Sequence, residues 1–124
     1  SPIILDCLPH GLLSGKSFYQ WKNTQAIPLT DTLFDNDSFC LAGLRSKTIG
    51  IYEKNSERKI ICDISEYPYT LLWSAPTKPM RFICIEPWYG RADAAGFDGN
   101  LQKRAWQNEL EPGKIFEKAY TIAF

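Results

Sequence analysis

Short runs in which hydrophobic and polar residues alternate recur along most of this chain, and they limit the folds open to it. In 59–65 (KIICDIS), the side chains of Ile60, Cys62 and Ile64 fall on one face of an extended strand. Helical periodicity is weak, with only possible turns near 30–35 and 100–106. The pattern predicts an all-β, antiparallel sandwich formed by one domain, 1–124, with strands in 38–44, 48–54, 59–65, 69–74, 81–87 and 114–124.

Turn residues separate these runs. The polar segment 55–58 (NSER) joins 48–54 to 59–65, and two such runs around a polar turn predict a β-hairpin. The first forty residues are different, because they contain several prolines and glycines and show no clear period. An irregular start of this kind leaves a strand edge exposed, which indicates a missing neighbour.

Composition excludes several classes of function. Lys+Arg and Asp+Glu both number 14, so the net charge of zero gives no reason to expect a nucleic-acid partner. No apolar run has the length of a membrane-spanning helix, and no signal peptide is recognisable, so we expect a cytoplasmic protein. A single histidine and four widely separated cysteines predict buried, reduced thiols and no metal site: Cys7, Cys40, Cys62 and Cys84.

The segment 80–93 (MRFICIEPWYGRAD) places a carboxylate where the alternation calls for a hydrophobic side chain. Phe82 and Cys84 share a face with Glu86, and Pro87 is expected to end the strand. A carboxylate among apolar neighbours is costly unless it is paired or functional. Burial also suits a carboxylate to exchange protons near neutral pH, as general acid–base catalysis requires.

Two interpretations of Glu86 stay open at this point. In the first, its carboxylate lies in a ligand pocket and transfers a proton. In the second, it reaches water at the end of the strand, or it forms an ion pair with Arg81 or Arg91.

Aromatic and acidic residues near the ends of neighbouring runs add to a possible ligand site. Indole rings stack on the C–H faces of sugars, which gives Trp73 and Trp88 a function besides packing. Asp35 and Asp37 either cap a turn or accept hydrogen bonds from ligand hydroxyls. His10, in a Pro-Gly setting, is expected to be a solvated loop residue.

Four segments occur in an order and at distances that resemble the C-terminal half of the aldose 1-epimerase (galactose mutarotase) family, with its LacX-like branch as the best likeness. The resemblance covers roughly residues 25–124. It implies the large antiparallel β-sandwich of that family and a cofactor-free reaction that interconverts the α and β anomers of an aldose. The segments are IPLTDTLFDNDSFCLAGL, EYPYTLLWSAP, FICIEPWYGRAD and LEPGKIFEKAYTIAF.

The resemblance also implies roles for individual residues. Glu86 matches the glutamate that takes the proton of the anomeric hydroxyl, and Asp37 lies nearest the family's pocket aspartate, with Asp35 or Asn36 as alternatives. Some members carry a glutamine in the strand before this glutamate. Here that region is occupied by Leu71 to Trp73 and no such glutamine is evident, so the specificity for sugar hydroxyls should differ from that of a galactose mutarotase. The resemblance implies an aldohexose as the substrate and leaves open which aldohexose it is and whether it is phosphorylated.

Length is the main departure from the family, whose members are more than twice as long. Their general-acid histidine lies in an N-terminal half, and His10 does not match it. The resemblance therefore implies a fragment that is inactive or nearly so alone. We expect such a fragment to associate with its missing N-terminal half or with itself, because half a sandwich exposes strand edges and apolar faces.

Overall fold

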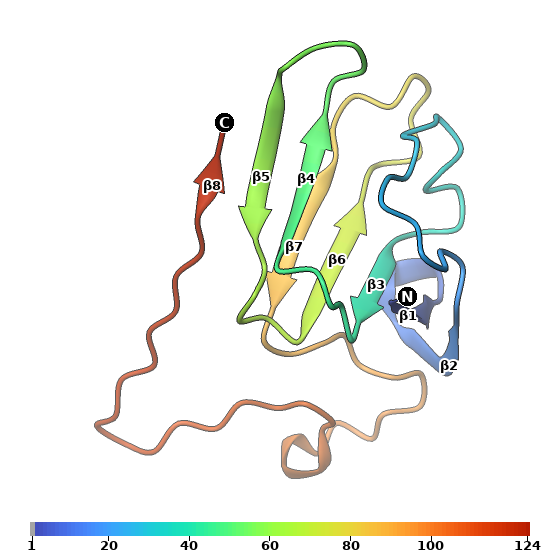
Figure 1. The fold of residues 1–124 in the computed structure, drawn as a ribbon. Helices are drawn as coiled ribbons and strands as arrows, with labels where there is room; N and C mark the ends of the chain where they lie inside the picture. Colours follow the sequence, from blue (N-terminus) through green and yellow to red (C-terminus); the bar gives the residue numbers. More distant parts are fainter. Residues whose placement is uncertain (1) are drawn as a thin grey trace.

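The computed structural model describes residues 2–124 and shows two antiparallel β-sheets with very little helix (Figure 1). The predicted all-β, antiparallel fold class is confirmed. In the five-stranded sheet the order is β2 (Leu13–Phe18), β1 (Ile3–Cys7), β3 (Phe39–Ala42), β6 (Tyr69–Trp73) and β7 (Cys84–Trp88). In the three-stranded sheet it is β4 (Thr48–Tyr52), β5 (Lys59–Asp63) and β8 (Ile122–Ala123).

Helical structure is confined to two short 3-10 turns, η1 (Pro9–Gly11) and η2 (Leu101–Lys103). The second falls within the turn predicted near 100–106, and residues 31–36 form the other predicted turn. Within residues 2–124, neither helix has the length or the apolar character needed to cross a membrane.

The main core lies on one face of the five-stranded sheet, where residues of the 21–34 segment and of the three-stranded sheet cover it. Ile4, Leu41 and Leu72 come from β1, β3 and β6 and are at most 7% exposed. Ile49 of β4 packs against this cluster, so the three-stranded sheet covers the same face of the five-stranded one. Figure 1 accordingly shows β4 in front of β7, with β5 beside β4. This packing makes the molecule a sandwich.

A second, smaller cluster lies on the opposite face of the five-stranded sheet. Its buried members are Leu13, Cys40 and Tyr69, and Leu71 and Trp88 pack partly buried against it. Because neighbouring residues of a strand point to opposite faces, the residues of β3 and β6 supply both clusters in alternation. The five-stranded sheet therefore has a core face and a second, partly apolar face.

The predicted hairpin is confirmed. β4 pairs with β5 so that Ile49 lies opposite Cys62 and Ile51 lies opposite Ile60, which puts their hydrophobic side chains on one face. Gly50 is required between them, because a Cβ atom there would lie 2.8 Å from the Ile60 carbonyl oxygen.

Three strand predictions need correction. β1 and β2 were not predicted at all. β7 begins at Cys84 and continues through Pro87 to Trp88, so the prediction that Pro87 ends the strand is wrong. β7 is an edge strand, where the missing N–H of a proline is tolerated. The final strand contains only Ile122–Ala123 rather than 114–124.

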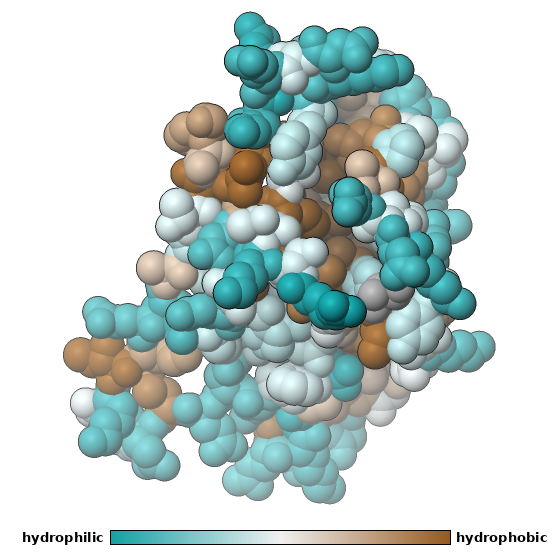
Figure 2. Space-filling view, viewed as in Figure 1, coloured by the Kyte–Doolittle hydropathy of each residue, from teal (hydrophilic) through white to brown (hydrophobic). Residues whose placement is uncertain are grey.

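Residues 105–121 form an extended arm that leaves the sandwich and returns beside β5 (Figure 1). Hydrophobic atoms are visible on this arm and over the sheets in Figure 2. Several of its side chains are exposed, including Ile115 at 82% and Phe116 at 54%. The arm therefore adds little to the core, and its contacts with the sandwich are local.

Candidate functional site

The residues of interest lie on the second face of the five-stranded sheet, in two rows that cross its strands. In the first row Leu5, Cys40, Leu71 and Glu86 lie opposite one another on β1, β3, β6 and β7. In the second row, Ala42, Tyr69 and Trp88 are neighbours in the same way. Glu86 is thus the last member of an otherwise apolar row, which fits the face assignment made from the sequence.

A cavity of about 200 Å³ opens over these rows. Its volume is below the roughly 300–1,000 Å³ typical of sites for drug-sized ligands, which suits a small molecule such as a monosaccharide. We call it the Glu86 cavity. It brings together four of the five predicted site residues, and its lining consists of Cys7, Gly11, Leu13, Asp37, Ser38, Cys40, Leu71, Trp73, Glu86, Trp88 and Ala92.

The Glu86 side chain is partly buried, and its carboxylate has no partner among the residues that the structure describes. Within residues 2–124 it makes no hydrogen bond and no ion pair, so neither Arg81 nor Arg91 neutralises it. Arg91 interacts with Tyr69 instead. A carboxylate held by a strand at a cavity wall and not engaged by the protein is available to a ligand.

Asp37 reaches the same cavity from the turn before β3. Its backbone is left-handed (φ 76°), and its Oδ1 atom accepts a hydrogen bond of 2.6 Å from the Ser38 N–H. This local bond fixes the side chain, as expected for an aspartate at a turn. Within residues 2–124 the second carboxylate oxygen makes no hydrogen bond, so it can accept one from a hydroxyl group.

Asp35 lies outside the cavity. Its Oδ2 atom is 3.5 Å from the Nζ atom of Lys78, and both side chains are largely exposed. Exposed ion pairs of this kind contribute little to stability. Of the two acidic residues that the sequence offered before β3, the structure places only Asp37 at the cavity.

Trp73 and Trp88 lie on either side of the row that ends in Glu86. Trp88 is two residues beyond Glu86 on β7, and Trp73 is two residues beyond Leu71 on β6. The Trp73 ring also meets the Phe82 ring edge-on, with centroids 5.8 Å apart. Two partly buried indoles beside a carboxylate can provide stacking surfaces for the C–H face of a sugar.

Sequence reasoning missed the cavity residues that come from β1 and β2, mainly Cys7 and Leu13. No periodic signal marks this part of the chain. Ser38 could have been found, since it follows Asp37 directly and precedes the apolar run of β3.

Within residues 2–124, neither His10 nor a basic side chain pairs with Glu86 or Asp37. His10 is exposed in η1 with a left-handed backbone (φ 72°), and only its neighbour Gly11 lines the cavity. Arg104 donates hydrogen bonds to the carboxylate of Asp93 and, at 2.8 Å, to the carbonyl oxygen of Arg91. Within residues 2–124, no three His, Cys, Asp or Glu side chains gather as metal ligands.

All four cysteines are free thiols, and two of them, Cys7 and Cys40, line the cavity. Burial raises the pKa of the Cys40 thiol from 9.0 to about 12 and also raises the pKa of Cys7. The neutral thiols therefore contribute apolar surface to the cavity floor and do not act as nucleophiles at neutral pH.

We expect Cys40 to resist alkylation in the folded protein. A pKa shift from 9.0 to about 12 lowers the thiolate fraction at pH 8 about a thousandfold, and burial slows the reaction further. Iodoacetamide labelling is followed by peptide mass spectrometry. Cys40 should stay unmodified in the native protein under conditions that label it fully in protein unfolded by urea. Equal labelling rates for Cys40 in the two conditions would contradict the placement of this thiol.

Comparisons with known proteins agree with this architecture. No protein-family profile matches the chain. The chain is 26% identical over 101 residues to the LacX proteins of Lactococcus lactis subsp. lactis, both the plasmid and the chromosomal form. The matched region is 82% of this chain and 33% of each LacX protein.

Two solved structures match almost the whole chain. A galactose mutarotase related enzyme from Lactobacillus acidophilus has a TM-score of 0.71 and 26% identity over 99% of this chain. A galactose mutarotase-like protein from Lactobacillus casei ATCC 334 has a TM-score of 0.75 and 25% identity over 98% of it. The chain has the fold of the galactose mutarotase-related proteins. The resemblance inferred from four sequence segments, including the LacX likeness, is confirmed.

The chain is much shorter than these relatives. It spans 33% of the length of the LacX proteins and 40% of the length of each solved structure.

Proposed function

We propose that this chain supplies the sugar-binding face and the general base of an aldose 1-epimerase-like catalyst, which interconverts the α and β anomers of an aldohexose. The observation that carries the proposal is the position of Glu86. Its unpartnered carboxylate lines a small cavity together with Asp37 and two tryptophans. This combination offers a proton acceptor, a hydroxyl acceptor and two stacking surfaces in one place.

In the proposed reaction Glu86 removes the proton from the anomeric hydroxyl of the sugar. The electron pair of that O–H bond forms the C1 carbonyl, the bond between C1 and the ring oxygen breaks, and the ring oxygen receives a proton from a general acid. Rotation about the C1–C2 bond presents the other carbonyl face. Closure then reverses both proton transfers, so the two acid–base groups return to their initial states.

Other residues of this cavity have binding roles in the proposal. Asp37 accepts hydrogen bonds from ring hydroxyls through its free oxygen, and Trp73 and Trp88 stack on the sugar. No cofactor is needed, because the reaction transfers only protons. The general acid is a histidine outside this chain, as the family resemblance implies, and residues 1–124 act as one part of a larger sandwich.

The test is to reunite the chain with the parts that it lacks. We expect a chimera with the uncovered portion of the Lactobacillus acidophilus protein to equilibrate fresh α-galactose or α-glucose faster than buffer, followed by polarimetry. The chain alone should show no acceleration, because one partner of the acid–base pair is absent. A folded chimera that leaves both sugars at the buffer rate would contradict the proposed activity.

A second function is favoured by one observation, the pair of tryptophans at the cavity. Among residues 2–124, no histidine lines the Glu86 cavity. In this second proposal, the chain is a non-catalytic carbohydrate-binding module. Such a module would bind sugar through Trp73 and Trp88 without exchanging protons.

A further inference from the structure

The C-terminal arm, residues 105–121, contacts residues that lie next to the end of β7. β7 is an edge strand whose only neighbour in the sheet is β6. Its last residue, Trp88, lines the Glu86 cavity, and the chain then continues as Tyr89 and Gly90. The arm contacts the residues around Trp88 at two separate points.

The first contact is made by Trp106. Its ring meets the Tyr69 ring edge-on with centroids 5.3 Å apart, and Tyr69 is the residue opposite Trp88 in the β6–β7 pair. The backbone of the arm also lies against Gly90, because a Cβ atom there would be 3.3 Å from the Trp106 carbonyl oxygen. Trp106 therefore contacts Tyr69, the strand neighbour of Trp88, and Gly90, which follows Trp88 by two residues.

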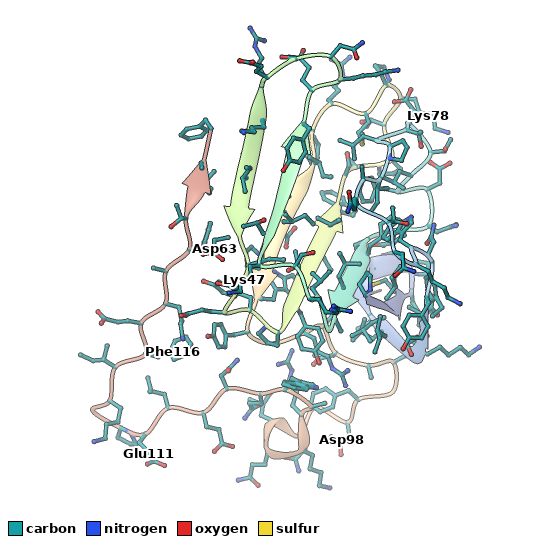
Figure 3. All side chains as sticks on the ribbon, viewed as in Figure 1. Lys47, Asp63, Lys78, Asp98, Glu111 and Phe116 are labelled. Carbon is teal, nitrogen blue, oxygen red and sulfur yellow. The ribbon has the colours of Figure 1, made fainter. Side chains whose placement is uncertain are left out.

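The second contact is made by Phe116, labelled on the arm in Figure 3, and by Lys118. The Phe116 ring meets the Tyr89 ring edge-on at 5.4 Å. The Nζ atom of Lys118 lies 5.1 Å from the centre of the Tyr89 ring and 3.0 Å from Oε2 of Glu66. Tyr89 and Glu66 raise the pKa of Lys118 to about 12, so its ammonium group is charged at all ordinary pH values.

Successive residues of a strand point to opposite faces, so the neighbours of Trp88 can be contacted outside the cavity that Trp88 lines. Tyr89 directly follows Trp88 and does not line the cavity, so contacts that hold Tyr89 also restrain the backbone at Trp88. Glu86 lies two residues earlier on the same strand and on the same face as Trp88. The arm also contacts the Tyr67 ring through Tyr120 and the Asp63 N–H through the Thr121 carbonyl oxygen. The contacts of Trp106, Phe116 and Lys118, however, are the ones next to Trp88.

We propose that the C-terminal arm is a positioning element for the Glu86 cavity, in which Trp106, Phe116 and Lys118 hold the Trp88 side chain in its binding orientation. Only the identity of the ligand, a sugar, depends on the function proposed above. The fixing of Trp88 is a property of the chain itself and can be measured without any ligand.

The test uses the full chain labelled with 5-fluorotryptophan, with the four ¹⁹F resonances assigned by Trp→Phe replacements. Lys118→Met removes the cation–π contact and the ion pair but keeps the aliphatic stem. We expect the Trp88 resonance to shift or broaden in this variant and the Trp21 resonance to stay unchanged. Lys118→Arg should restore the wild-type Trp88 resonance, because a guanidinium group can stack on Tyr89 and pair with Glu66.

Lys114→Met is the matched control, since the Lys114 side chain is exposed and makes no hydrogen bond or ion pair with any described residue. It should leave Trp88 unaffected. Phe116→Ala combined with Lys118→Met should enlarge the effect. A Trp88 resonance that is the same in the wild type, Lys118→Met and the double variant would overturn the proposal.

A galactose titration separates this inference from the proposed function. Where the wild type binds galactose, Lys118→Met should raise the dissociation constant about twofold to fivefold, the range that a partly exposed cation–π contact supports. Where the wild type binds no sugar, the proposed function fails but the ¹⁹F comparison still decides the role of the arm. Unchanged galactose affinity in the double variant would count against positioning.

Discussion

Replacing Glu86 by Gln should abolish anomer exchange in the chimera and leave sugar binding largely intact. Gln has nearly the shape of Glu but cannot accept the hydroxyl proton, and a positioned general base typically contributes about a hundredfold to ten-thousandfold in rate. Polarimetry gives the exchange rate, and tryptophan fluorescence during a galactose titration gives the affinity. A loss of kcat with an almost constant affinity is the signature of a group that acts in the transition state.

Glu109→Gln is the control for that experiment. Glu109 is exposed on the arm and its side chain makes no hydrogen bond or ion pair within residues 2–124, so this variant should exchange anomers at the unaltered rate. Full activity in Glu86→Gln would exclude Glu86 as the base. Retained binding with no exchange in either the parent chimera or the variant would instead favour the carbohydrate-binding module.

Leu41→Ala should lower the free energy of unfolding of the chain by about 2–5 kcal/mol. Leu41 is 2% exposed and lies in the main core cluster, so the shortened side chain leaves a buried cavity. Small domains are stable by only about 5–15 kcal/mol, so this loss is a large fraction of the total stability. Urea denaturation with an unchanged m-value would measure it.

Leu110→Ala is the matched substitution at the surface. Leu110 is 55% exposed, and its truncation should change the free energy of unfolding by no more than about 0.5 kcal/mol. Equal effects of the two leucine substitutions would mean that the interface between the sheets does not form the core of this chain.

The sequence predicted most strands of the two sheets and missed β1 and β2. β5 alternates clearly, since Cys62 is buried and Lys59 is solvated. β1 packs Ile4 into one cluster and Leu5 against the other, so both of its faces are hydrophobic and no alternation results. The missing period in β1 thus reflects its interior position between β2 and β3, whereas β2 is an edge strand and is mostly exposed.

The candidate site was predictable only in part. An acidic residue in an apolar strand pattern singled out Glu86, and its face could be counted along the strand. The choice between Asp35 and Asp37 depends on a turn with a left-handed residue, which spacing alone does not reveal. The contacts of Trp106 and Lys118 with β7 join residues far apart in the chain, and no local pattern predicts them.

The cavity wall is assembled from strands that lie far apart in the sequence, from Cys7 in β1 to Trp88 in β7. No single hairpin can therefore form the site ahead of the rest of the five-stranded sheet. Any small molecule that occupies this cavity binds only the assembled sheet, and by mass action it shifts the folding equilibrium towards the native state. The thermal stability of the chain therefore rises when a ligand occupies the cavity. An increase in melting temperature consequently reports which compounds the cavity binds.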